Sequence, residues 1–136
     1  MKATDLMIGD LIKIKGHLDY DKVQEIARDE NMQWYISFAC SATLFRAYEF
    51  EPIPLTPEIL EKNGFGFVKS SDKDTVWNGW WINKGLELAT ACLDKEGNWP
   101  CYINIYDSNI KCEYVHQLQH ALRLCGLDEL ADNFKV

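Results

Sequence analysis

The sequence has little of what membrane proteins and nucleic-acid-binding proteins need. No stretch of 18 consecutive apolar residues occurs, so the sequence predicts no membrane-spanning helix. Positive charge is scarce, because 14 lysines and arginines stand against 21 acidic residues and give a formal net charge of −7. Affinity for nucleic acid rests on Lys and Arg neutralising phosphates, so a general DNA- or RNA-binding role is disfavoured. The opening MKATDLMIGD has no apolar run of signal-peptide length, and we expect a cytoplasmic protein.

The chain also lacks the short motifs that mark familiar catalytic and nucleotide-binding sites. GxxxxGK[ST], GxGxxG, GxSxG and HRD do not occur. The five cysteines form no CxxC pair, and their odd number predicts reduced thiols rather than a disulfide framework. We therefore expect a non-enzymatic protein with no cofactor and no metal ion.

What the sequence does contain is typical of a folded domain. Apolar residues make up 47% of the chain and aromatic residues 12%, which is enough for a core. In MIGDLIKIKG, apolar and charged residues alternate between two glycines, which is typical of a short strand. The stretch MQWYISFACSATLFRAYEF predicts two strands that meet near Ser41. Dense short strands of this kind predict that residues 1–55 form a small SH3-like β-barrel.

EPIPLTPEILEKNGF contains the clearest local signal in the chain. Thr56 can cap a helix, Pro57 occupies the favoured first helical position, and Gly64 is a suitable end. The sequence after it predicts an antiparallel β-meander followed by a helix, with Asp128 as the cap of a further short helix. We expect an α+β fold in which residues 56–136 place two helices on the meander and pack with residues 1–55 as one unit.

YVHQLQHALRLCG, residues 114–126, places two histidines four residues apart. At 100° per residue, Leu118, Leu122 and Cys125 share one side of a helix, which predicts an inward face. The other side carries four polar residues that we interpret as an outward, partner-facing surface: His116, Gln119, His120 and Arg123. A metalloprotease would need glutamate where Gln117 stands, so we predict no metal site here.

Two further features suggest chemistry or contact. Cys112 precedes His116 by four residues and is the best candidate for a nucleophilic thiol, although an unreactive strand-end cysteine is the simpler interpretation. Trp80 and Trp81 lie in a tryptophan-rich stretch, and tryptophan is enriched at protein interfaces. Both tryptophans are therefore candidate partner-contact residues, alongside the polar face of the last long helix.

The order of three segments resembles a known group of proteins. The opening IGDLIKI, the central EPIPLTPEILEKNGF and the C-terminal YVHQLQHALRLCG are similar to those of a family of small uncharacterised proteins of gut bacteria and their phages. The resemblance implies no activity, cofactor or catalytic residue. It implies a cytoplasmic accessory protein of a bacterium or its phage.

Three functions remain open from the sequence. We expect a non-enzymatic protein-interaction or accessory protein of phage or mobile-element origin, with a protein partner and no membrane. One alternative is a nucleic-acid-related role, including acidic mimicry of DNA. Another is a small-ligand binder or thiol enzyme that uses Cys112 and His116. The sequence does not predict whether copies of the chain associate.

Overall fold

The computed structural model describes residues 2–17, 19–39, 41–46, 49–69, 78–84, 87–92, 101–105 and 108–136. The chain divides into two compact units, Met1–Ile53 and Pro54–Val136. Both units contain an antiparallel five-stranded sheet, and the helices longer than one turn belong to the second unit. The chain is therefore α+β.

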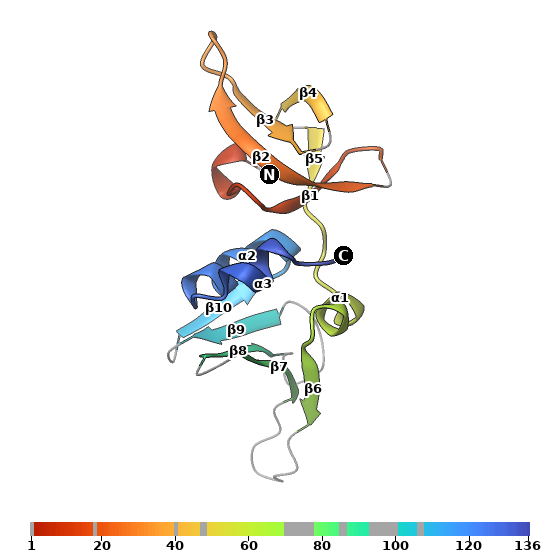
Figure 1. The fold of residues 1–136 in the computed structure, drawn as a ribbon, viewed down its shortest axis with the longest axis vertical. Helices are drawn as coiled ribbons and strands as arrows, with labels where there is room; N and C mark the ends of the chain where they lie inside the picture. Colours follow the sequence, from red (N-terminus) through yellow and green to blue (C-terminus); the bar gives the residue numbers. More distant parts are fainter. Residues whose placement is uncertain are drawn as a thin grey trace. The chain divides into compact units, whose positions relative to one another are not determined.

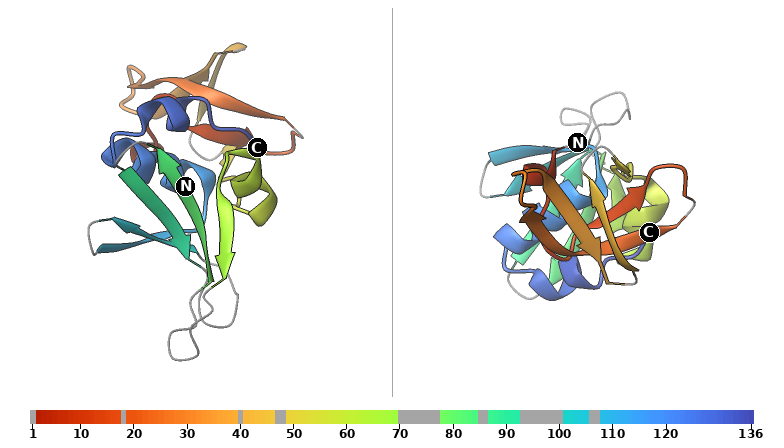
Figure 2. Two further views of the ribbon diagram at one scale, coloured as in Figure 1. Left: turned by 60° about the horizontal axis from the view of Figure 1, so that its bottom comes forward. Right: turned by 90° about the horizontal axis from the view of Figure 1, so that it is seen from above.

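The first unit is a curled antiparallel sheet (Figure 2). After a short 3-10 helix, η1 (Ala3–Asp5), its strands are β1 (Leu11–Ile14), β2 (Tyr20–Arg28), β3 (Trp34–Phe38), β4 (Ser41–Arg46) and β5 (Phe50–Glu51). Their order in the sheet is β4-β3-β2-β1-β5, so β1 lies between β2 and β5. The separation of β3 from β4 at Ser41 is the one that the sequence predicts.

The core of the first unit follows from the alternation within these strands. Ile12, Val23, Ile36 and Phe38 are almost completely buried, and Val23 is paired with Phe38 and Ile26 with Ile36 across β2 and β3. The ring of Phe38 meets the rings of Phe45 and Phe50 edge to face, at centroid distances of 5.4 and 5.6 Å. Edge-to-face contact is the arrangement that aromatic quadrupoles favour. The strand ends are therefore held by aromatic packing as well as by backbone hydrogen bonds.

The second unit begins with the helix that the sequence predicts. α1 spans Pro57–Lys62, and the Oγ1 atom of Thr56 accepts a hydrogen bond from the backbone N–H of Ile59 at 3.4 Å. The chain leaves the helix through Asn63 and through Gly64, whose φ of +82° is costly for any residue with a Cβ atom. The predicted cap, the proline at the first position and the glycine end are all confirmed.

The second sheet follows α1 and contains β6 (Gly66–Lys69), β7 (Asn78–Lys84), β8 (Glu87–Cys92), β9 (Cys101–Ile105) and β10 (Ser108–Cys112). Each strand pairs antiparallel with the next along the chain, in the order β10-β9-β8-β7-β6. Ser108 and Asn109, at the start of β10, are residue types that favour turns. In the structure they pair with Ile105 and Asn104 of β9.

Two helices follow β10. α2 (Val115–Leu124) contacts β10, and α3 (Asp128–Asp132) packs against α2 (Figure 1). The prediction that Asp128 caps the short helix is wrong: Leu127 occupies the cap position and Asp128 is the first helical residue. The helix starts one residue earlier because the backbone oxygen of Leu127 already accepts a helical hydrogen bond from the N–H of Ala131, at 3.0 Å.

Candidate functional site

The apolar side of α2 lies where the sequence places it. Leu118 and Leu122 are fully buried, and Cys125 at the end of the helix is a buried thiol. The helix begins through a reciprocal cap in which Oε1 of Gln117 accepts hydrogen bonds from the backbone N–H groups of Glu113 and Tyr114, at 2.7 and 3.2 Å. Gln117 therefore occupies the position of a metalloprotease glutamate but stabilises the helix start.

The prediction that four polar residues of α2 face outward is wrong for two of them. Gln119 and His116 are buried, whereas His120 and Arg123 are partly buried. The amide nitrogen of Gln119 donates a hydrogen bond to the backbone oxygen of Ala131 in α3, at 2.8 Å. Arg123 contacts the carboxylate of Asp132, also in α3, at 3.1 Å. Part of this polar face is therefore covered by the chain's own last helix.

The histidine pair lies in a row of rings. His116 stacks on Tyr114 with a centroid distance of 5.8 Å, and His120 meets His116 edge to face at 5.9 Å. Among the described residues, no group of three or more His, Cys, Asp or Glu side chains is placed to hold a metal ion. The geometry of these rings is that of packing at the start of α2.

Cys112 ends β10 and is completely buried. Burial penalises the charged thiolate and raises the pKa of the Cys112 thiol to about 12. Because the thiolate is the nucleophilic form, this thiol is neutral and inert near pH 7. The structure thus gives Cys112 the surroundings of a core residue.

Trp80 and Trp81 lie on β7, where Trp80 pairs with Phe67 and Ala91 and Trp81 pairs with Gly66 and Thr90. Their side chains lie outside the described part of the structure. Their role as contact residues stays a prediction.

The first unit contains a turn that the sequence pattern does not predict. Met7, Ile8, Gly9 and Asp10 form a β-turn in which the N–H of Asp10 donates to the oxygen of Met7 at 3.2 Å. Gly9, at the third position, has a φ of +89°, which is typical of a type II turn. Met7 and Ile8 remain 46% and 66% exposed at its tip. The signal that could have indicated it is the Gly-Asp pair directly before β1.

The Met7–Asp10 turn is held from both sides. The side chain of Asp10 is fully buried, and its Oδ2 atom accepts the N–H of Met7 at 2.7 Å. The backbone of β2 holds the other end, because the N–H of Gly9 donates to the oxygen of Val23 and the N–H of Val23 donates to the oxygen of Asp10. The two exposed apolar side chains thus stand on a rigid base.

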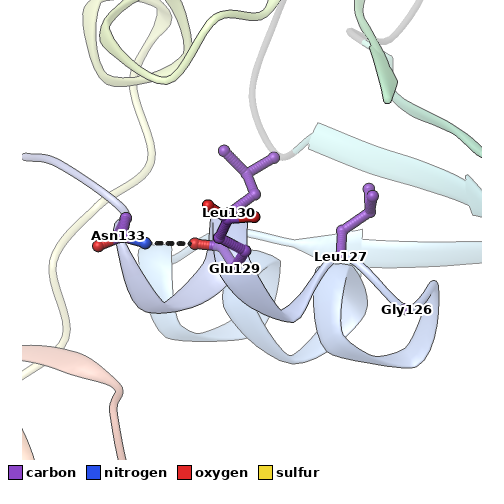
Figure 3. Close-up of a pocket in the computed structure, with 5 residues that line it drawn as sticks. All are labelled: Gly126, Leu127, Glu129, Leu130 and Asn133. Atoms are coloured by element: carbon purple, nitrogen blue, oxygen red, sulfur yellow. Dashed lines mark hydrogen bonds between the residues drawn. The ribbon is translucent and has the colours of Figure 1, made fainter. Parts of the chain in front are cut away.

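A pocket of about 320 Å³ lies at the α2–α3 junction of the second unit. Figure 3 shows Leu127 and Leu130 projecting to the same side of the chain, with Glu129 and Asn133 beside them. The side-chain nitrogen of Asn133 donates to the backbone oxygen of Glu129 at 2.9 Å. Among the described residues, the pocket is thus lined by two leucines, Gly126, one carboxylate and one side-chain amide.

Comparison with known proteins finds no family model, curated protein or solved structure that matches this chain. Within the described part of the chain, every helix is too short or too polar to span a bilayer.

Proposed function

We propose that this chain is a cytoplasmic, non-enzymatic protein-interaction or accessory protein of phage or mobile-element origin. In this proposal the first unit is an SH3-like barrel and the second sheet is a β-meander with helices packed on it. The order β4-β3-β2-β1-β5 supports the barrel, and the pairing of each later strand with its successor supports the meander. The resemblance of three sequence segments to proteins of gut bacteria and their phages supports the origin.

The observation that carries the proposed interaction is the Met7–Asp10 turn. Single exposed apolar residues are normal on protein surfaces and need no explanation. Met7 and Ile8 differ because they are adjacent and because a buried carboxylate fixes the turn that presents them. A contact surface that is already rigid loses less conformational entropy when a partner binds. We therefore assign Met7 and Ile8 to the contact with a protein partner.

The assignment of Met7 and Ile8 to a partner contact can be tested by photo-crosslinking in the cells that naturally make the protein. A photoreactive amino acid replaces Ile8 in one variant and Leu44 in a control variant. Leu44 is a matched control, because it lies in β4 of the same unit and is 57% exposed. We expect a discrete cross-linked protein from position 8 that disappears when Met7→Ser is added, and no such product from position 44.

The outcomes separate the proposal from its alternatives. Equal products from both positions, or none from position 8, would overturn the assignment of the turn. A product that nuclease treatment degrades would favour the nucleic-acid-related role instead. A cross-linked partner that itself binds DNA would support the DNA-mimicry form of that alternative.

A further inference from the structure

We infer that the pocket at the α2–α3 junction takes the side chain of a lysine or arginine from a partner protein. This inference rests on the proposed interaction role, because the cation is assigned to a protein rather than to a small molecule. It uses a different surface from the Met7–Asp10 turn, so either assignment can fail alone.

The size of the pocket limits what it can hold. Its volume of about 320 Å³ is at the lower end of the range for ligand pockets. Leu127 and Leu130 supply the apolar base, and Gly126 has open space where a Cβ atom would stand. An extended alkyl chain fits such a site better than a large planar cofactor does.

The polar residues that line the pocket indicate which charged group a ligand would carry. No described residue forms an ion pair or a side-chain hydrogen bond with the carboxylate of Glu129, in contrast to Asp132, which is paired with Arg123. One N–H of the Asn133 amide donates to the backbone oxygen of Glu129, and the Asn133 side-chain oxygen can accept a hydrogen bond. The Glu129 carboxylate is negative and accepts hydrogen bonds only, so it favours a ligand with a positively charged donor group.

Two apolar side chains beside a negative carboxylate are the complement of a basic side chain. Lysine and arginine bury their methylene stems on apolar surface while the charged head stays at the edge in water. Leu127 and Leu130 are placed for the stem, and Glu129 and Asn133 are placed for the head. The formal net charge of −7 favours the approach of a basic partner segment as well.

The test is an NMR titration of the full chain with defined peptides at low ionic strength. The probe is a short, blocked serine–alanine peptide with one central arginine, and a second peptide carries lysine there. The matched peptide carries citrulline, which has the shape of arginine without its charge. We expect saturable shifts of the Gly126 backbone amide and the Asn133 side-chain amide with the arginine and lysine peptides, and much weaker shifts with the citrulline peptide.

Two variants sharpen the test. Glu129→Gln should weaken binding about fivefold, as expected for loss of one partly exposed ion pair. Asp128→Asn removes the same charge from the neighbouring residue, which does not line the pocket, and should leave binding unchanged. Equal binding of the arginine and citrulline peptides, equal effects of the two variants, or shifts only outside the pocket would overturn the inference. Tighter binding of propylguanidinium than of the arginine peptide would also overturn it, by assigning the pocket to a small cation.

Discussion

Asn63 binds the backbone of Lys135 through both ends of its side-chain amide. Its nitrogen donates to the oxygen of Lys135 at 2.7 Å, and its oxygen accepts the N–H of Lys135 at 2.8 Å. The same nitrogen also donates to the oxygen of Ile59 in α1 at 2.7 Å. Asn63 is buried, so this one amide joins the end of α1 to the last residues of the described chain.

We predict that Asn63→Ala destabilises the protein by about 3 kcal/mol. The change removes three hydrogen bonds at a buried position and leaves backbone groups of Lys135 and Ile59 without their partner. The measurement is the free energy of unfolding from urea titration.

Asn133→Ala is the matched control, because Asn133 also ends a short helix and also donates to the oxygen four residues earlier. Asn133 is exposed, so its loss should cost less than about 1 kcal/mol. Equal costs would contradict the importance of the Lys135 bonds.

Gln119 gives a second prediction about the second unit. Gln119→Ala should destabilise the protein by about 2 kcal/mol, because the buried oxygen of Ala131 loses its donor and a small cavity forms between α2 and α3. Thermal or urea unfolding measures the loss. Leu124→Ala lies on the same helix but removes a side chain that is 74% exposed, so it should change stability by less than about 0.5 kcal/mol. A Gln119→Ala protein as stable as the Leu124→Ala protein would mean that α3 does not depend on this bond.

The sequence predicts most successfully the features that neighbouring residues determine. The helix from Pro57 was predictable in full, because Thr56, Pro57 and Gly64 act on the same few backbone groups. The apolar side of α2 was predictable for the same reason, since Leu118 and Leu122 repeat with the helix period. Local signals of this kind need no knowledge of the rest of the fold.

The features that failed depend on contacts distant in sequence. Gln119 is polar and lies on the polar side of α2, yet it is buried because Ala131 of α3 accepts its hydrogen bond. Helix periodicity cannot reveal that a second helix covers this side. The Met7–Asp10 turn depends in the same way on the backbone of Val23 in β2. Neither candidate surface could therefore be located from the sequence alone.

Asp10, the buried residue that holds the Met7–Asp10 turn, gives a third prediction. Asp10→Ala should destabilise the protein by about 2 kcal/mol, because it removes a fully buried side chain and takes the acceptor from the N–H of Met7. Asp10→Asn keeps an oxygen at the same position and should cost less. Both effects are measured as free energies of unfolding. Asp5→Ala is a suitable control, because Asp5 accepts the N–H of Lys2 at an exposed site of the same unit. If Asp10→Ala cost no more than Asp5→Ala, the turn would not rest on the buried carboxylate.

Cys112 gives a prediction about pH. Burial raises the pKa of its thiol to about 12, whereas an exposed cysteine in the unfolded chain has a pKa of about 8.5. Between these values the unfolded state releases the thiol proton and the folded state keeps it. The contribution of the Cys112 thiol to the free energy of unfolding is therefore fully present below about pH 8.5. It falls by about 1.4 kcal/mol for each pH unit above that value.

The measurement is urea unfolding of the wild-type protein and of Cys112→Ala at pH 8 and pH 10.5, in the presence of a reductant. Other groups that titrate in this range are common to both proteins, so only the difference between them reports on Cys112. We expect the advantage of the wild type over Cys112→Ala to shrink by about 2.6 kcal/mol at the higher pH. Iodoacetamide at pH 8 should leave Cys112 unmodified in the folded protein and label it in urea, because only the thiolate reacts and only unfolding exposes it. Parallel pH profiles for the two proteins, or rapid labelling of Cys112 in the folded state, would show that the thiol is accessible and would reopen its role as a nucleophile.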